Sequence, residues 1–378
     1  MLKYVVRCFK LIPSMGDAGR GAPWARTRHR RGAPMGLTGG RTRRWNHPKH
    51  ERPRMIVITG GAGFIGSALL WKFNTLGEKN ILVVDQNAKN SPKWGNLKKR
   101  SFEQYLESGE FIERLERGEF KGKITAVLHL GACSDTTEMN RDFLRRNNSE
   151  YSERLARWAV QNKVYFQYAS SAAVYGDGEL GFSDDDALTP RLKPLNPYGQ
   201  SKLDFDLWVL RQGYERFLTG FRYFNVYGPN EYHKGEMRSL VHKGFGQIQA
   251  TGKIRLFKSY KKEYPDGGQK RDFLYVKDAV DAMIWFYRNP QRKGLYNLGS
   301  GRAQSWNELT GALFTACGKS KNIEYFDMPG TIRNQYQYFT EAHLKKLKAS
   351  GCPSEFKDLQ GGVRDYVQNY LLKEDPFL

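Results

Sequence analysis

A glycine-rich turn between two apolar segments is the feature that most constrains how this chain folds. Residues 55–58 form an apolar run, glycines spaced three apart follow at Gly60, Gly63 and Gly66, and the apolar pattern then resumes. This order predicts a strand, a tight turn and a helix. Glycine lets the backbone turn sharply and approach a ligand closely, while the N–H groups at the helix start can face a pyrophosphate.

A second apolar run strengthens this interpretation, because residues 81–84 are all apolar and end at Asp85. A carboxylate at the end of the second strand, about twenty residues beyond the glycines, usually meets the ribose of a dinucleotide. The alternative is a structural turn beside a surface aspartate. We favour the dinucleotide interpretation, because both strands and the acid occur in the expected order.

The length and the cysteine content exclude several classes of protein. At 378 residues the chain is long enough for one large α/β domain or two closely joined ones. Its apolar runs are far shorter than the roughly 20 residues needed to span a bilayer, so we expect no membrane segment. The four cysteines are scattered without metal-ligand spacing, which predicts free thiols in a reducing compartment, no disulfides and no metal site.

The net charge of +22 is concentrated at the N-terminus. Residues 1–54 hold 14 Lys and Arg against Asp17 and Glu51, and their Gly, Arg and Pro content predicts a disordered basic extension. Three interpretations are open: an organelle presequence, a basic arm for nucleic acid or anionic lipid, or an upstream extension outside the fold. We favour the last, because Met55 opens the first strand directly, and we predict no nucleic-acid partner.

From residue 55 the chain alternates short apolar runs with amphipathic segments, which predicts an α/β fold with a doubly wound, Rossmann-type parallel sheet. The predicted strands are 55–59, 81–85, 126–130, 165–170 and 220–224, and the predicted helices are 67–76, 147–162 and 198–216. The segment 86–121 places a further strand only vaguely. Beyond Tyr227, Gly and Pro clusters interrupt the pattern. We therefore expect a dinucleotide-binding domain over 55–226 and, interleaved with it, a smaller α/β substrate-binding region over 227–378, with short strands at 253–257 and 294–298 and a helix at 305–317.

Tyr198 and Lys202 stand four residues apart after Pro197, a residue that favours a helix start, so both side chains lie on one helix face. A phenol has an ordinary pKa of roughly 10 and is a poor base at neutral pH. A neighbouring ammonium stabilises the phenolate, so this spacing predicts a lowered Tyr198 pKa and a proton shuttle. The alternative is an amphipathic helix with one aromatic residue and one solvated lysine.

A strand that ends in small hydroxyl residues supplies the third element. Residues 168–176 read Tyr-Ala-Ser-Ser-Ala-Ala-Val-Tyr-Gly, so Ser171 lies at the carboxyl end of the predicted strand, where ligands bind in parallel sheets. Its hydroxyl can bond a substrate alcohol or carbonyl. The alternative is that it only caps the following turn.

These three elements, in this order and spacing, resemble the extended short-chain dehydrogenase/reductases. A closer resemblance, covering residue 55 to the C-terminus, is to the ADP-glyceromanno-heptose 6-epimerases. It rests on the segments 129–138 (HLGACSDTTE), 220–229 (GFRYFNVYGP), 233–235 (HKG), 270–273 (KRDF) and 336–340 (YQYFT). Those enzymes invert one carbon of a nucleotide-activated heptose for bacterial lipopolysaccharide. Residues 1–54 lie outside the resemblance.

The resemblance implies an isomerase that oxidises the carbon-6 alcohol of ADP-heptose with tightly bound NADP and then reduces it from the opposite face. By matching position, Tyr198 is one acid/base and Lys234 the other, Lys202 tunes Tyr198 and holds the nicotinamide ribose, and Ser171 binds the reacting oxygen. Read from the residues alone, Lys234 is a loop lysine beside His233. The resemblance also implies a cytoplasmic homo-oligomer, a pentamer in that family.

Further positions follow from the same match. The implied cofactor contacts are Gly60, Gly63, Phe64, Ile65, Gly66, Asp85, Gln86, Lys93, Leu130, Gly131, Ala132, Cys133, Ser134, Asn147, Lys202, Val226 and Lys234. The implied substrate contacts are Ser171, Asn225, Glu236, Lys243, Phe257, Lys258, Ser259, Arg271 and Tyr336. A guanidinium fork such as that of Arg271 suits diphosphate oxygens, although the residue could instead pair with Asp272.

The sequence departs from the family pattern at three positions. Gln86 replaces the usual Asn, and Glu236 and Lys243 stand where Ser and His are expected. The loop 259–269 is also longer than usual. Asp85 repels the 2′-phosphate of NADP, but Lys93 nearby offsets this, so we predict NADP, with NAD as the alternative.

Other functions are less well supported. A 4,6-dehydratase needs an Asp-Glu pair after the strand-end hydroxyl, and here Ala172 and Ala173 occupy those positions. A non-catalytic dinucleotide-binding protein commonly lacks the Tyr or the Lys of the shuttle, and this chain keeps both. The remaining alternative is another nucleotide-sugar epimerase of the same superfamily.

Overall fold

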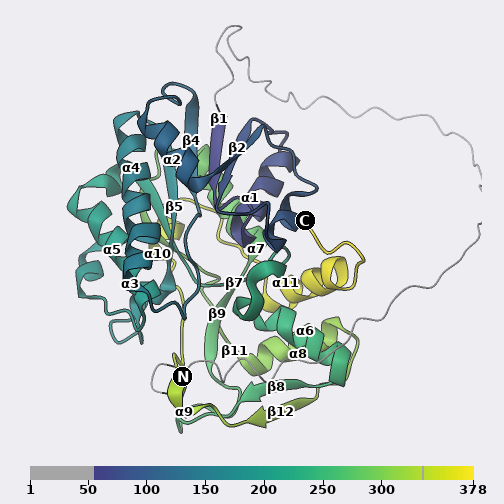
Figure 1. Cartoon of the computed structure of the whole chain (residues 1–378). Helices are drawn as coiled ribbons and strands as arrows, with labels where there is room; N and C mark the ends of the chain where they lie inside the picture. Colours follow the sequence, from purple (N-terminus) through teal and green to yellow (C-terminus); the bar gives the residue numbers. More distant parts are fainter. Residues whose placement is uncertain (1–54, 334–335) are drawn as a thin grey trace, which may run out of the picture. The chain divides into compact units, whose positions relative to one another are not determined.

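A seven-stranded parallel sheet forms the centre of the chain in this computed structural model, which describes residues 55–333 and 336–378 (Figure 1). The predicted doubly wound α/β fold is therefore confirmed. The predicted disorder of residues 1–54 concerns residues outside the described part. In the described part, none of the helices combines the length and the apolar character needed to cross a membrane.

The strands and helices agree in position with most of the predicted segments. The strands are β1 (Met55–Thr59), β2 (Ile81–Asp85), β3 (Gln104–Glu107), β4 (Ile124–His129), β5 (Tyr165–Ser171), β6 (Leu218–Tyr223), β7 (Asn225–Tyr227), β8 (Ile254–Phe257), β9 (Lys270–Tyr275), β10 (Gly294–Leu298), β11 (Ala303–Ser305) and β12 (Ile323–Phe326). The α-helices are α1 (Phe64–Thr75), α2 (Ser108–Glu116), α3 (Arg141–Leu144), α4 (Tyr151–Gln161), α5 (Pro197–Arg211), α6 (Leu240–Thr251), α7 (Val276–Arg288), α8 (Trp306–Ala316), α9 (Gly330–Arg333), α10 (Lys345–Ala349) and α11 (Leu359–Tyr366).

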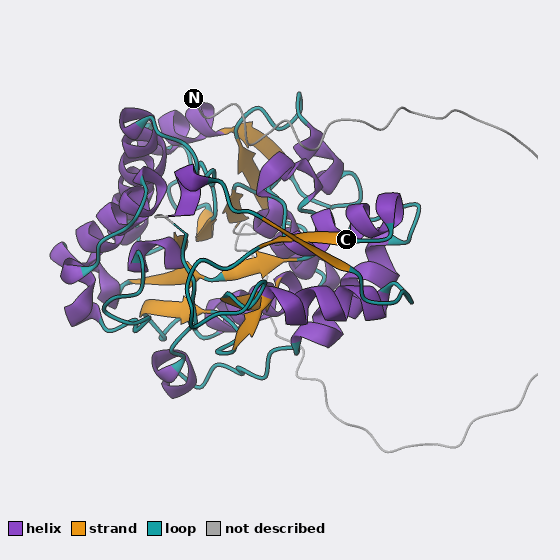
Figure 2. Cartoon of the chain, turned by 90° about the horizontal axis from the view of Figure 1, so that it is seen from below, coloured by secondary structure: helices purple, strands orange, loops and turns teal. Residues whose placement is uncertain are grey.

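Helices cover both faces of the large sheet, because successive strand residues point to opposite sides. Ile56 and Ile58 of β1 belong to a core cluster that includes buried residues of α1 and α7, whereas Val57 belongs to a second cluster with α2, α4 and α5. Figure 2 shows helices in purple around the orange strands. Two apolar layers therefore fix the sheet.

The strand order is β10-β6-β5-β4-β1-β2-β3, so the chain reverses its direction of growth between β1 and β4. In open α/β sheets, ligands bind at such a reversal, beyond the carboxyl ends of the strands. Gly60 follows β1 and Gly131 follows β4, and a Cβ atom built on Gly60 would lie 2.7 Å from the Gly131 nitrogen. The two predicted cofactor segments thus meet at the reversal point.

Two small sheets, β11-β9-β7 and β12-β8, stand apart from the large one. Strand β10 does not belong to them, although we expected it in the smaller region; it pairs in parallel with β6. The C-terminal half of the chain therefore completes the large sheet as well as building the small ones. Helix α5 is shorter than predicted, ending at Arg211, because Gly213 adopts a left-handed conformation with φ +67°.

Candidate active site

The glycine-rich turn is packed so closely that side chains would not fit at two of its positions. Gly60 has φ +66°, and a Cβ atom on Gly66 would lie 2.1 Å from the Gly60 carbonyl oxygen. Helix α1 begins directly afterwards, and within the described residues no side chain caps its N-terminus at Gly63. Uncapped N–H groups and the helix dipole attract a negatively charged group. This turn fits the pyrophosphate of a dinucleotide.

The carboxylate predicted to meet the ribose lies beside this turn and already has partners. Asp85 is 6% exposed, and its Oδ2 accepts a 2.9 Å hydrogen bond from the Ala62 nitrogen. Its Oδ1 lies 2.8 Å from the ammonium of Lys93, which also donates to the Gln86 carbonyl oxygen. An anion and a cation therefore stand together where the adenosine end of a dinucleotide would lie.

The segment after β4 is held by an asparagine that the sequence analysis did not select. Asn148 accepts a hydrogen bond from the Cys133 nitrogen at 2.8 Å and donates to the Cys133 carbonyl oxygen at 3.0 Å. It also donates to the Ser201 hydroxyl on α5. The predicted contact Asn147 bonds the Asn148 side chain and is half-buried. An adjacent Asn pair was the available signal, but only the fold shows which member points inward.

Tyr198 and Lys202 lie on the first turns of α5, as predicted. The Asn196 side chain caps the helix by accepting a 2.7 Å bond from the Gly199 nitrogen, and Pro197 occupies the first helical position. Tyr198 is 8% and Lys202 is 7% exposed. The first turns of α5 therefore hold both side chains beside the carboxyl end of β5, where Lys202 bonds the Ala169 oxygen and Tyr198 bonds Ser171.

The expected lowering of the Tyr198 pKa is wrong in this structure. Burial raises the pKa of Tyr198, and a hydrogen bond with the Ser171 hydroxyl opposes this only in part. Burial lowers the pKa of Lys202 to about 8, and its Nζ donates to the Ala169 carbonyl oxygen at 2.9 Å. Tyr198 is therefore a neutral phenol at pH 7, able to donate a proton.

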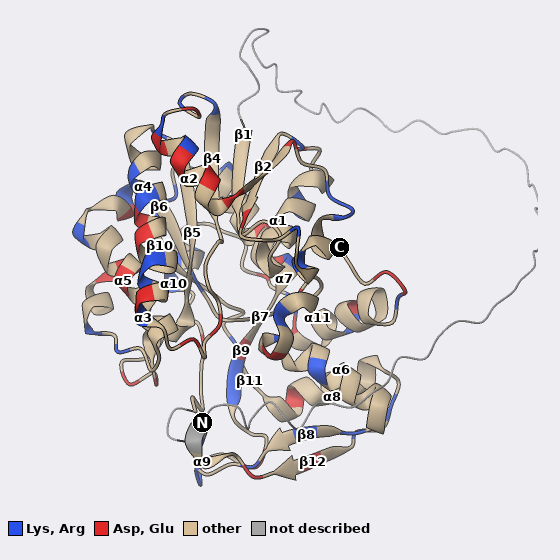
Figure 3. Cartoon of the chain, in the orientation of Figure 1, with Lys and Arg blue, Asp and Glu red and all other residues tan. Residues whose placement is uncertain are grey.

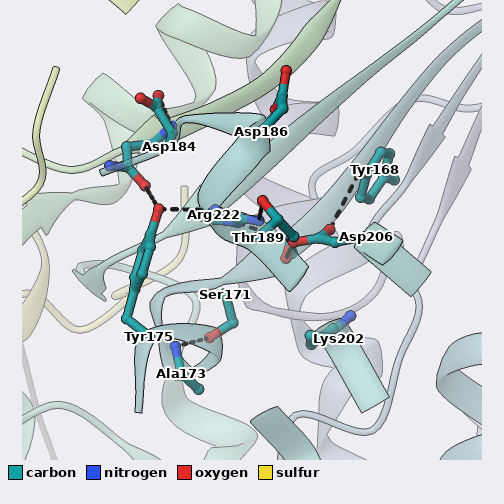
Figure 4. A network of polar contacts seen from close by, with 12 residues as sticks. Tyr168, Ser171, Ala173, Tyr175, Asp184, Asp186, Thr189, Lys202, Asp206 and Arg222 are labelled. Carbon is teal, nitrogen blue, oxygen red and sulfur yellow. Dashed lines mark hydrogen bonds and ion pairs between the residues drawn. The ribbon is translucent and has the colours of Figure 1, made fainter. Parts of the chain in front are cut away.

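The Ser171 hydroxyl caps the following turn, and its predicted bond to a substrate stays a prediction. Its Oγ accepts a 3.1 Å hydrogen bond from the Ala173 nitrogen, which caps the turn after β5 (Figure 4). The same side chain bonds Tyr198. Ser171 thus combines a turn cap with a contact to Tyr198.

A buried polar network surrounds this helix and was not predicted. Arg222 of β6 forms an ion pair with Asp206 of α5, and both side chains are fully buried. Asp206 also accepts hydrogen bonds from Ser170 and Tyr168, while Arg222 donates to Tyr175 (Figure 4). The network joins the end of β5, the following turn, α5 and β6. It fixes the elements that carry Ser171, Tyr198 and Lys202.

Lys234 lies in the 3₁₀ helix Tyr232–Met237, opposite the glycine-rich turn. Its Nζ stands 5.4 Å from the centroid of the Phe64 ring, at the start of α1. Burial lowers the pKa of Lys234, and Glu231 opposes the shift. This lysine therefore lies beside the glycine-rich turn rather than in a solvated surface loop.

A separate cluster gathers three of the predicted substrate contacts. Arg271 is 8% exposed, and its guanidinium lies 5.3 Å from the Tyr336 ring and 5.8 Å from the Trp306 ring. The Phe257 ring contacts Tyr336 edge-on, with centroids 6.2 Å apart. Figure 3 shows the start of β9, where Arg271 lies, as a basic stretch.

The alternative of an Arg271–Asp272 pair is not observed. Asp272 accepts hydrogen bonds from the Ser300, Gly301 and Ala342 nitrogens. Within the described residues no carboxylate forms an ion pair with Arg271, whose Nη1 donates to the neighbouring Lys270 carbonyl oxygen. Burial accordingly lowers the pKa of Arg271. A buried guanidinium without an acidic partner suits an anionic ligand.

Three other predicted substrate residues form contacts within the chain. Lys258 pairs with Asp327 at 3.3 Å, and the Ser259 hydroxyl donates to the Lys261 carbonyl oxygen. Lys243 donates to the main-chain oxygen of Glu236, whose own side chain is exposed. Two predicted contacts lie on β7, where Asn225 is exposed and Val226 half-buried.

Comparison with known proteins agrees with this arrangement. Residues 56–299 match the model of the NAD dependent epimerase/dehydratase family. The chain is 50% identical to ADP-L-glycero-D-manno-heptose-6-epimerase of Nitratidesulfovibrio vulgaris strain DP4, over 86% of this chain and 100% of that protein. It is 44% identical to the protein of the same name from Fusobacterium nucleatum, again over 86% and 100%.

Solved structures of epimerases have a fold similar to that of this chain. The Helicobacter pylori ADP-L-glycero-D-manno-heptose-6-epimerase superposes with a TM-score of 0.69 at 29% identity, covering 84% of this chain and 96% of that one. A Thermus thermophilus UDP-glucose 4-epimerase in complex with NAD, 24% identical with a TM-score of 0.64 over 83% and 97%, shares the fold. The chain therefore belongs to the NAD dependent epimerase/dehydratase family and, within it, to the ADP-L-glycero-D-manno-heptose-6-epimerases.

Proposed function

We propose that this chain interconverts the two carbon-6 epimers of ADP-glycero-manno-heptose with NADP held at the glycine-rich turn. The epimerase activity, and with it the class of isomerase, follows from the family to which the chain belongs. The observation that carries the proposal is the burial of Tyr198 and Lys202 on one face of α5, at the carboxyl edge of the sheet that also carries the glycine-rich turn. The same family membership supports a role in supplying lipopolysaccharide precursor in the cytoplasm.

When bound, the dinucleotide supplies the acceptor and later the donor of one hydride, so that carbon 6 is oxidised and then reduced from its other face. Residues of this chain transfer the proton of the carbon-6 oxygen. Tyr198 protonates the carbonyl oxygen and Lys234 takes the alcohol proton; the pKa of Tyr198 is raised and that of Lys234 is lowered, and these directions favour the two roles. Two groups with shifts in opposite directions divide the work.

The remaining residues bind and orient. Ser171 holds the reacting oxygen beside Tyr198, and Lys202 binds the nicotinamide ribose. Arg271 between Tyr336 and Trp306 binds the diphosphate of the sugar nucleotide. Lys93 next to Asp85 supports NADP over NAD, because its ammonium offsets the repulsion between the carboxylate and a 2′-phosphate. We also propose that the chain contains a dinucleotide-binding region and a substrate-binding region, and that it forms a homo-oligomer.

The test is to incubate the purified chain with each ADP-heptose epimer separately and follow the ratio of epimers. We expect both reactions to reach the same final ratio without added cofactor. Tyr198→Phe and Lys234→Met should each slow the approach by about 10²–10⁴-fold, the usual contribution of a positioned acid or base. Unchanged rates in both variants would refute the two-group mechanism, and no interconversion by the unmodified chain would refute the function.

A further inference from the structure

The last residues of the chain are packed against the dinucleotide end of the sheet. After α11 the chain runs back to the region of α1, where the C-terminal label lies in Figure 1. Leu378 is 5% exposed and belongs to the core cluster that contains α1. Phe377 covers Gly95, because a Cβ atom on that glycine would meet the Phe377 ring at 3.0 Å. The C-terminal residues therefore contact segments that lie far from them in the sequence.

One set of contacts reaches the segment that leads into Lys234. The Tyr232 hydroxyl donates to the Pro376 carbonyl oxygen at 2.6 Å, and the Tyr232 and Phe377 rings meet edge to face at 5.2 Å. The Leu378 nitrogen donates to the Asn230 Oδ1 at 3.1 Å. Asn230 is fully buried with φ +77°, and its amide nitrogen bonds the Ser67 hydroxyl on α1. The C-terminal segment thus holds the start of the Lys234 loop against α1.

A second set of contacts reaches the segment that follows Lys93. Lys99 donates to the Phe377 carbonyl oxygen and Arg100 to the Leu378 main-chain oxygen, both at 2.7 Å. Lys99 also pairs with Asp375 at 3.0 Å, but both of those side chains are exposed, so this pair contributes little. The charge-assisted bonds to main-chain oxygens fix where this segment lies.

The two segments meet at the glycine-rich turn. The side-chain nitrogen of Asn96, 2% exposed, lies within 3.2 Å of the Ala62 oxygen, the Asn230 oxygen and the His233 Nδ1. One amide therefore touches the turn and both segments at once. Movement of either segment would break contacts that the turn needs.

We propose that residues 375–378 are a strap that positions Lys93 and Lys234 around the bound dinucleotide. The strap contacts neither the sugar nor the cofactor; it acts through Tyr232, Asn230 and Gly95. The inference rests on the proposed function only in taking Lys93 and Lys234 as cofactor-side residues. Its physical basis is that ordering two loops before binding removes the entropy cost of ordering them during binding.

The test compares Phe377→Ala with Phe377→Tyr, which keeps the ring, and with Leu372→Ala, which removes an exposed side chain from the same part of the chain. NADPH binding is measured by fluorescence titration after bound dinucleotide has been removed. Hydrogen exchange is followed in residues 92–100 and 230–238, with β4 and β5 as internal references. We expect Phe377→Ala to weaken NADPH binding at least tenfold and to speed exchange in the two loop segments only.

Phe377→Tyr and Leu372→Ala should bind NADPH within about twofold of the unmodified chain. Unchanged NADPH binding in Phe377→Ala would overturn the strap, as would faster exchange spread evenly over β4 and β5, because the segment would then only stabilise the domain. The proposed function fails separately, if the unmodified chain neither binds NADPH nor interconverts the heptose epimers.

Discussion

Asp206 on α5 and Arg222 on β6 form a fully buried ion pair, with 3.0 Å between the carboxylate Oδ2 and the guanidinium Nε. Asp206 follows Lys202 by one helical turn. Burial lowers the pKa of Lys202 to about 8, and the Asp206 carboxylate limits that fall. The pair therefore links the stability of the fold to the charge of Lys202, a residue of the proposed active site.

Replacing Asp206 with Asn should destabilise the protein strongly, because the Arg222 charge would remain buried without its partner. Loss of one member of such a pair costs about 3–5 kcal/mol. Urea unfolding measures this, with Asp204→Asn on the same helix as the control, since Asp204 is only half-buried and bonds Gln200. The control should change the unfolding free energy by less than about 0.5 kcal/mol. Equal small losses in both variants would contradict a structural role for the buried pair.

Lys93→Met should change the choice of cofactor. Without the ammonium at 2.8 Å, the Asp85 carboxylate faces the 2′-phosphate of NADP alone, so NADPH affinity should fall by about tenfold or more, or about 1.4 kcal/mol. NADH affinity should change much less. Fluorescence titration of both nucleotides measures this, and Lys89→Met serves as a control because its ammonium lies over the Tyr105 ring instead. A similar loss for both nucleotides would argue against a role in selecting NADP.

Arg271→Lys should raise the KM for ADP-heptose without weakening NADPH binding. Lysine keeps the charge but loses the two-pronged fork and the contacts that the planar guanidinium makes with the Tyr336 and Trp306 rings. A KM increase of about 10–100-fold is expected, which corresponds to about 1.4–2.8 kcal/mol. Steady-state kinetics with the sugar nucleotide, beside NADPH titration, separate the two effects. Lys270→Met, at the exposed neighbouring position, is the control. An unaltered KM would remove Arg271 from the substrate site.

Acid should destabilise the protein partly through His129. Its ring bonds the Thr59 and Ser152 hydroxyls, and burial lowers its pKa to about 3 from 6.5. Below pH 6.5 the unfolded chain binds a proton that the folded chain does not, so stability falls by about 1.4 kcal/mol per pH unit towards the folded pKa. Burial lowers the pKa values of His233 and His242 to about 4, which adds in the same direction.

Urea unfolding at pH 5, 6 and 7 isolates the His129 contribution. The His129→Gln variant is less stable at pH 7 but should have a shallower dependence on pH, by about one proton. A slope equal to that of the unmodified chain would mean that His129 is already charged in the folded protein.

Local signals in the sequence were sufficient for β1, β2, β4, β5 and β6 of the large sheet and for the glycine-rich turn, but not for β3 and β10. The glycine spacing and the acid at Asp85 predicted a tight turn between a strand and a helix. The structure shows why glycine is needed there, because a side chain on Gly60 would collide with Gly131. Tyr198 and Lys202 were placed correctly, because a spacing of four residues is a property of the helix itself. The family resemblance supplied Lys234, whose loop carries no regular pattern.

Long-range contacts could not be predicted from the sequence. The Asp206–Arg222 pair and the double hydrogen bond of Asn148 to Cys133 depend on how separate elements pack. The direction of the Tyr198 pKa shift was also missed, because the spacing reveals a nearby lysine but not the degree of burial. Residues 294–298 were expected in the smaller region, whereas β10 joins the large sheet, because short apolar strands look alike wherever they pair.

The transfer of one hydrogen away from carbon 6 and back is tested most directly with ADP-heptose that carries deuterium at that carbon. The labelled sugar is incubated with the purified chain in ordinary water, without added cofactor, and the newly formed epimer is examined by mass spectrometry. The account predicts that the new epimer keeps its deuterium, because the hydride never exchanges with solvent. Replacement of the deuterium by hydrogen from water would contradict it, since the carbon would then be inverted by proton removal.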